Sequence, residues 1–178
     1  LIMTNHHVID NSTEVRVIFE DGRMYEANII GSDRLTDIGL VKIVASNLIP
    51  ISIGNSDKML VGDLAVAIGH PLTLGAAPTV TTGVVSALER RLDVGGDLMG
   101  SSVTLFGLIQ TDAPITRGSS GGALINKNGE LIGITTAIAT ADVGAEGLGF
   151  AVPINLALNI AEDLIKDGKI LHAFLGIL

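Results

Sequence analysis

The sequence predicts an all-β protein, a barrel or a sandwich, that ends in one α-helix. Short apolar runs recur along most of the chain and are separated by turn residues such as Gly, Asn and Asp. Apolar residues make up 47% of the 178 residues but aromatic residues only 3%, so the core must be built from Val, Ile, Leu and Ala, which suit pleated strands. Near the C-terminus the apolar spacing changes to that of a helix.

The N-terminal part contains a predicted hairpin and a separate strand. Residues 13–19 alternate between polar and apolar side chains, Asp21-Gly22 supplies a turn, and residues 24–30 form the return strand. Another strand is expected at 38–44. Further strands are expected at 64–68, 79–87, 103–110, 122–126 and 131–138, with a tight turn at Asn128-Gly129 between the last two.

Residues 64–88 lack charged side chains and are long enough to suggest a membrane span. Pro71, Pro78 and several glycines divide this stretch, so we expect strands and loops in its place. The final element is an amphipathic helix at 155–167, which Asn155 can cap and Gly168 can end. Its apolar face consists of Ala157, Ile160, Ala161, Leu164 and Ile165.

The composition excludes several classes of partner. The formal net charge of −8 and the lack of any Lys/Arg cluster argue against nucleic acid, which needs concentrated positive charge. The absence of cysteine excludes disulfides and thiolate metal sites but leaves the compartment open. No cofactor is expected.

A glycine-flanked serine is the most informative motif. In Gly118-Ser119-Ser120-Gly121-Gly122, the missing Cβ of Gly118 lets the backbone turn and place its N–H beside that of Ser120. Two such donors can hold the oxyanion of an attacked carbonyl. Such a segment alone is more often a glycine-rich turn, so a catalytic interpretation needs a base and an acid elsewhere.

Both groups are present. His7 lies in Thr-Asn-His-His-Val at 4–8, and Asp37 precedes the strand predicted from residue 38. The chain order His7, Asp37, Ser120 is that of chymotrypsin-like enzymes, whereas other folds arrange the same groups differently. With the segments around these residues, the chain resembles the HtrA/Deg family of trypsin-like serine proteases over nearly its whole length. The matching segments also include Val-Gly-Asp at 61–63, Ala-Ile-Gly-His-Pro at 67–71, Thr-Gly-Val-Val-Ser at 82–86, Gln-Thr-Asp-Ala at 110–113 and Asn-Gly-Glu-Leu-Ile-Gly-Ile at 128–134.

This resemblance implies two six-stranded antiparallel β-barrels of the chymotrypsin type, the first incomplete, and a C-terminal helix. Because only six residues precede His7, two leading strands and any signal peptide or membrane anchor are expected upstream of Leu1. The implied segments are a partial N-terminal barrel at 1–56, a C-terminal barrel at 57–152, the helix region at 153–170 and the start of a linker toward a PDZ domain at 171–178.

The resemblance also assigns roles. Ser120 is the expected nucleophile, His7 its general base and Asp37 the group that orients the imidazole. Gly118, Ser119 and Ser120 form the expected oxyanion hole. Relatives commonly carry Asn at the position of Ser119, which leaves the hydrogen bonding of this loop open. Arg117 either steers the loop or is a solvated charge.

The family's specificity pocket maps onto Ile115, Ile138 and Ala139. None is a carboxylate that could pair with Lys or Arg, so cleavage after small or medium aliphatic residues is expected. Ordinary core packing is the alternative for the two isoleucines. His6 beside His7 suggests zinc, but on a strand adjacent side chains point to opposite faces, and no metal site is expected.

The implied function is hydrolysis of misfolded or unfolded proteins in the cell envelope, in the periplasm or another extracytoplasmic space. By resemblance, a homotrimer is expected for the full-length protein. The alternatives are a peptide-binding or chaperone module that does not cleave its ligand, and a fragment that is inactive.

Overall fold

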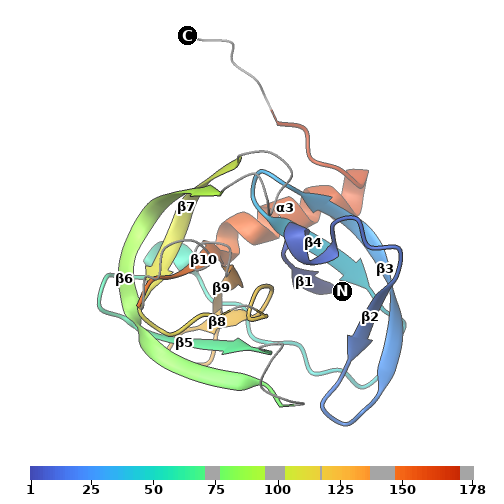
Figure 1. Ribbon diagram of the computed structural model, residues 1–178, viewed down its shortest axis with the longest axis horizontal. Helices are drawn as coiled ribbons and strands as arrows, with labels where there is room; N and C mark the ends of the chain where they lie inside the picture. The colour runs from blue at the N-terminus through green and yellow to red at the C-terminus, as the bar shows by residue number, and fades with distance from the viewer. Residues whose placement is uncertain (71–76, 95–102, 117, 137–146, 173–178) are drawn as a thin grey trace.

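The computed structural model describes residues 1–70, 77–94, 103–116, 118–136 and 147–172. These residues form two antiparallel β-sheets, and the long helix α3 packs on strands of both (Figure 1). The first sheet is open and the second is a closed barrel. The expected all-β fold, with an incomplete first barrel and a C-terminal helix, is confirmed.

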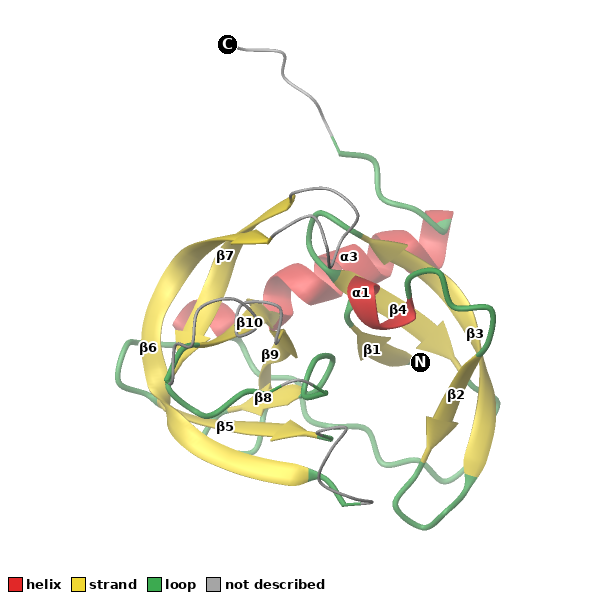
Figure 2. Ribbon diagram, viewed as in Figure 1, coloured by secondary structure: helices red, strands yellow, loops and turns green. Residues whose placement is uncertain are grey.

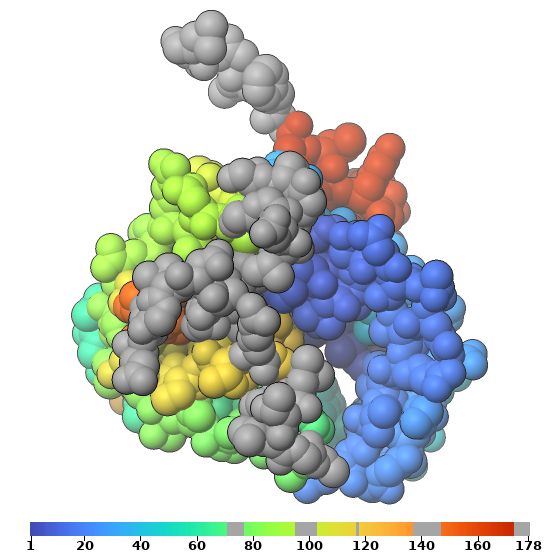
Figure 3. Space-filling model, in the orientation of Figure 1, coloured from blue at the N-terminus to red at the C-terminus, as the bar shows by residue number. Residues whose placement is uncertain are grey.

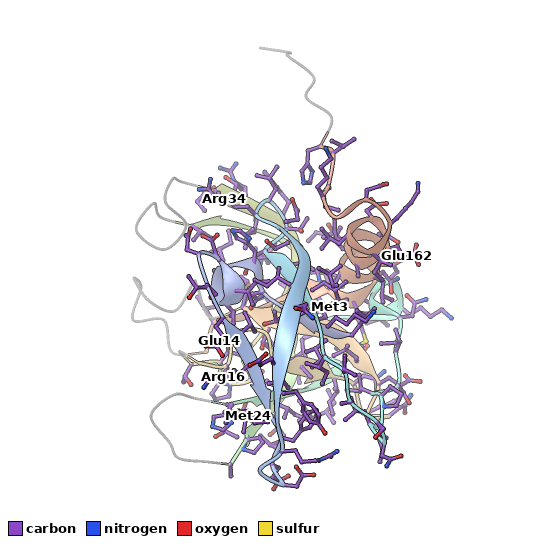
Figure 4. All side chains as sticks on the ribbon, turned by 90° about the vertical axis from the view of Figure 1, so that its right-hand side faces the viewer. Met3, Glu14, Arg16, Met24, Arg34 and Glu162 are labelled. Atoms are coloured by element: carbon purple, nitrogen blue, oxygen red, sulfur yellow. The ribbon has the colours of Figure 1, made fainter. Side chains whose placement is uncertain are left out.

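The N-terminal sheet has the strand order β1-β4-β3-β2. Its hairpin β2–β3 is the one predicted from alternation, and Val15 pairs with Ala27 across it. Glu14 and Arg16 lie beside each other on the outer side and form an exposed ion pair at 2.7 Å (Figure 4). The elements are β1 (Ile2–Thr4), the short helix α1 (His6–Ile9), β2 (Val15–Ile18), β3 (Met24–Asp33) and β4 (Ile38–Lys42).

The barrel closes in the order β10-β7-β6-β5-β8-β9 (Figure 2). A 3₁₀ turn, η1 (Ser56–Lys58), precedes it, and β5 and β6 contain residues 64–69 and 79–88 of the uncharged stretch that is long enough for a membrane span. Among the described residues, no helix has the length and apolarity needed to cross a membrane. The barrel strands are β5 (Leu64–Gly69), β6 (Thr79–Val94), β7 (Val103–Thr111), β8 (Ala123–Ile125), β9 (Leu131–Thr136) and β10 (Gly149–Pro153).

Among the strands, β6, β10 and β1 differ most from the sequence expectations. The strand expected at 79–87 continues to Val94, because register shifts along β7 allow the pairing to persist through polar residues. β10 was not anticipated: four of its five residues are buried, so it shows no alternation. β1 was also missed, since three residues carry too little pattern.

The helix α3 spans Ile154–Asp167 and ends at Gly168, which adopts φ +70° and donates its N–H to the carbonyl of Leu164. The expected cap at Asn155 is wrong. The helix begins one residue earlier, and the side chain of Asn155 bonds to Asn55 instead, which links α3 to the segment before η1. Ile165 is also not part of the buried face, because 55% of it is exposed.

The buried face of α3 supports a prediction. Leu164 is fully buried in the core that joins the two sheets, whereas the adjacent Ile165 is mostly exposed. Leu164→Ala leaves a cavity and is expected to lower the free energy of unfolding by about 2 to 5 kcal/mol. Ile165→Ala, the matched control, should change it by less than about 0.5 kcal/mol. Urea denaturation followed by circular dichroism measures both, and equal effects would contradict this packing.

Candidate active site

His7 lies in α1, directly after β1. The backbone turns at this point, because Val8 donates its N–H to the carbonyl of Asn5 and Asp10 donates to His6. His6 and His7 therefore follow each other on a helical turn, and the expectation that they share a strand is wrong. The Nδ1 atom of His6 lies 2.8 Å from the hydroxyl of Ser32. Among the described residues, no group of three His, Cys, Asp or Glu side chains gathers around a metal-sized space.

Asp37 lies in the turn between β3 and β4 and has a fully buried side chain. Its left-handed backbone, φ +57°, is unusual for a residue with a side chain. Two donors hold this conformation: the N–H of His6 and the amide Nδ2 of Asn5 both bond to the carbonyl of Asp37, at 3.1 and 3.0 Å. The sequence is thus bent so that the carboxylate points back toward α1.

Both oxygens of the Asp37 carboxylate have hydrogen-bond partners. Nδ1 of His7 lies 2.9 Å from each carboxylate oxygen, and the backbone N–H of His7 donates to Oδ1 at 3.1 Å. The hydroxyl of Thr136 in β9 donates to Oδ2 at 3.2 Å. Because an ionised carboxylate accepts only, we assign a ring proton to Nδ1; in the neutral imidazole, Nε2 of His7 is then an acceptor.

Ser120 lies in a tight turn at the start of β8. Gly118 adopts φ +92°, the N–H of Ser119 bonds to Thr116, and the N–H of Gly122 bonds to the carbonyl of Ser119. Ser120 itself is partly exposed. The expected need for glycine at position 118 agrees with this backbone.

The turn packs against the segment that carries His7. Gly121 has φ +79°, and a Cβ there would collide with the hydroxyl of Thr4 and lie 3.4 Å from the N atom of Asn5. A glycine is therefore required where the two sheets meet. Ser120 and His7 are close in sequence to the residues that make this contact. The structure thus brings the two segments together at Thr4, Asn5 and Gly121, which we call the junction.

Two adjacent threonines of β9 complete this junction, and the sequence analysis missed both. Thr136 bonds to Asp37, as described above, while the backbone of Thr135 exchanges hydrogen bonds with Gly121 and Gly122 at 2.9 and 3.0 Å. All residues of β9 are buried. Two hydroxyls inside an otherwise apolar buried strand were the available signal, since buried polar groups need partners.

The predicted specificity residues are only partly within the described residues. Ile115 is 5% exposed and packs in the barrel core, with Cδ1 so close to Gly149 that a Cβ there would lie 2.8 Å away. Its segment is fixed by Asp112, which accepts the N–H of Val84 at 2.7 Å. Ile138, Ala139 and Arg117 lie outside the described residues.

A large pocket of about 500 Å³ lies between β1, the connection before η1, the start of β8 and α3. Its lining is apolar and includes Met3, Ile53 and Leu158, with no titratable side chain. Figure 3 shows the surface hollowed between the N-terminal sheet and the barrel. This pocket borders the Ser120 turn at Gly121 and Gly122 and offers no chemistry of its own.

The model of the trypsin-like peptidase domain matches residues 1–134, three quarters of the chain. The chain belongs to the trypsin-like peptidase family. It is similar to the periplasmic pH-dependent serine endoprotease DegQ of Escherichia coli (strain K12), with 49% identity over 177 residues, which are 99% of this chain and 37% of DegQ. It thus spans well under half the length of this curated relative.

Solved structures agree with this family. The HtrA-type protease AlgW with a bound decapeptide superposes with a TM-score of 0.81 at 41% identity, over 93% of this chain and 48% of that one. A serine endoprotease from Yersinia pestis has a TM-score of 0.80 at 40% identity, over 99% of this chain and 57% of that one. The expected resemblance of this trypsin-like peptidase to the HtrA/Deg branch is confirmed.

The bond between Thr136 and Asp37 supports a prediction about stability. Thr136→Val removes a donor from a buried carboxylate, and we expect the free energy of unfolding to fall by about 1.5 to 3 kcal/mol. Urea denaturation at neutral pH measures this loss.

The matched control is Thr104→Val, which removes a hydroxyl bonded to the exposed carboxylate of Asp93. Hydrogen bonds from Thr104 and Arg91 hold the pKa of Asp93 below its usual value. Thr104→Val should raise the pKa of Asp93, and NMR titration measures this change. Ionised Asp93 can stabilise the fold above that pKa. We expect this contribution to decrease only slightly, because water replaces the lost donor. An equal loss in both variants would show that burial of Asp37 is unimportant.

Proposed function

We propose that the protein is a serine endopeptidase with Ser120 as nucleophile, His7 as general base and Asp37 as the orienting carboxylate. The observation that carries the proposal is the hydrogen bond between the fully buried carboxylate of Asp37 and Nδ1 of His7. In the neutral imidazole this bond leaves Nε2 as an acceptor, and the segment of His7 packs against the Ser120 turn through Thr4 and Gly121. A base, its orienting acid and a hydroxyl nucleophile are the parts that acyl transfer requires.

In the proposed reaction, the hydroxyl of Ser120 attacks the scissile carbonyl carbon while Nε2 of His7 takes its proton. The carbonyl oxygen becomes an oxyanion, which the N–H groups of Gly118 and Ser120 stabilise. The C–N bond then breaks, and His7 returns the proton to the leaving amine. Water attacks the resulting acyl-enzyme by the same route and restores Ser120. Asp37 stays ionised and stabilises the imidazolium of His7.

The test is hydrolysis of casein by the full-length protein. Ser120→Ala removes the nucleophile and is expected to lower kcat by at least about 10⁴-fold, since the triad acts as a unit. A fluorophosphonate probe should label the wild type at Ser120 and not the variant. Ser12→Ala, an exposed serine in the N-terminal sheet region, is the control and should retain full activity. Casein binding without turnover in the wild type would favour a peptide-binding module.

The proposed specificity pocket combines Ile115, Ile138 and Ala139. An uncompensated Lys or Arg side chain would be costly in such apolar surroundings. Cleavage is therefore expected after Val, Ala, Ile or Leu. Mass-spectrometric profiling of a peptide library checks this, and dominant cleavage after Arg would refute the pocket assignment.

The proposed substrates are unfolded polypeptides, and the proposed location is the periplasm or another extracytoplasmic part of the cell envelope. Support comes from relatives: DegQ is named a periplasmic endoprotease, and AlgW binds a decapeptide in its solved structure. A homotrimer, an upstream membrane anchor and the segment boundaries at 56 and 152 stay predictions from the family resemblance.

A further inference from the structure

Thr135 makes three hydrogen bonds to the turn that carries Ser120. Its backbone N–H donates to the carbonyl of Gly122 at 3.0 Å, and its own carbonyl accepts the N–H of Gly121 at 2.9 Å. Its side-chain hydroxyl donates to the carbonyl of Ser119 at 2.5 Å. The backbone bonds are available to any residue at position 135, whereas the third depends on the hydroxyl.

The hydroxyl bond acts on one particular peptide unit. The carbonyl of Ser119 and the N–H of Ser120 belong to the same planar group, and in a trans peptide they point in opposite directions. The described residues contain no cis peptide bond. A donor that draws the Ser119 carbonyl toward β9 therefore aims the Ser120 N–H away from β9, toward the side on which the turn is partly exposed.

The surroundings of this carbonyl are largely shielded from solvent. Thr135 is fully buried and Ser119 is 8% exposed. A Cβ at Gly122 would lie 2.9 Å from the Ser119 carbonyl oxygen and 3.0 Å from the Thr135 hydroxyl oxygen. Glycine at this position therefore leaves room for the hydrogen bond between these two groups. A Cβ at Gly69 would lie 2.8 Å from the Cβ of Ser119, so a glycine there leaves room for this side chain.

We propose that Thr135 is a positioning residue for the oxyanion hole: its hydroxyl fixes the 119–120 peptide so that the Ser120 N–H faces the developing oxyanion. The inference rests on the proposed function, because it assigns the orientation of one of the two proposed donors. Thr135 does not touch the substrate and acts only through this peptide. The Gly122 N–H, 3.1 Å from the same carbonyl, holds it in part when the hydroxyl is absent.

The experiment compares Thr135→Val and Thr135→Ser in the full-length protein. Loss of an entire oxyanion donor costs about 10²- to 10³-fold in kcat, and because Gly122 still holds the peptide we expect a loss of about 10- to 100-fold in T135V. KM should stay within about threefold. T135S keeps the hydroxyl and should recover kcat to within about threefold of wild type. Thr111→Val, another buried threonine of the barrel whose hydroxyl serves the N–H of Ala113, controls for stability loss alone and should retain its kcat.

A second readout separates positioning from a general structural role. A peptidyl trifluoromethyl ketone forms a tetrahedral adduct with an oxyanion, and its affinity should fall in T135V by the same factor as kcat/KM. Binding of an uncleaved peptide in a Ser120→Ala background should not change with T135V. Unaltered ketone affinity, or equal losses for ketone and peptide, would overturn the inference. If T135V fails to fold, Thr135→Ala compared with T135S isolates the hydroxyl in the same way.

Failure of the proposed function has its own signature. A full-length wild type that neither hydrolyses casein nor reacts with a fluorophosphonate refutes the endopeptidase proposal. The positioning inference is then decided by crystal structures of the wild type and T135V. A rotated 119–120 peptide in T135V supports it, and an unchanged carbonyl direction overturns it.

Discussion

The buried carboxylate of Asp37 is the constraint around which this molecule is arranged. A charge removed from water must be hydrogen-bonded, and its donors come from both halves of the chain: His7 from the N-terminal sheet and Thr136 from the barrel. The left-handed backbone of Asp37 is in turn held by Asn5 and His6. The orientation of the imidazole is therefore a result of docking the two sheets, and not a property of α1 alone.

The end of β9 links the surroundings of Asp37 to the Ser120 turn. Thr136 serves Asp37, and its neighbour Thr135 serves the Ser119 carbonyl. Because successive side chains of a strand point to opposite faces, two adjacent residues of one rigid strand reach both groups at once. Any shift of β9 would thus alter the hydrogen bonds of Asp37 and of the Ser120 turn together.

Local patterns account for what the sequence predicted well. Alternation and turn residues predicted the β2–β3 hairpin and most barrel strands, since these signals depend on neighbours in the chain. The turn around Ser120 and the positive φ of Gly118 could likewise be predicted from the sequence, because a glycine favours such a backbone whatever its tertiary surroundings. β10 was missed since burial on both faces removes alternation, and the cap of α3 was wrong because Asn155 bonds to a residue about a hundred positions away.

By itself, the sequence determined the strand-rich fold, the order His7, Asp37, Ser120 and the membership of a protease family, since these follow from residue types and their spacing. Only the tertiary structure decided that His7 lies on a helical turn, that Asp37 is fully buried and that two threonines of β9 bond to Asp37 and to the Ser120 turn. The physical reason is that the hydrogen-bond partners of a buried group are the residues that lie near it in the folded protein, however far apart they are in the chain. Residues 37 and 136 become partners only once the sheet and the barrel have packed.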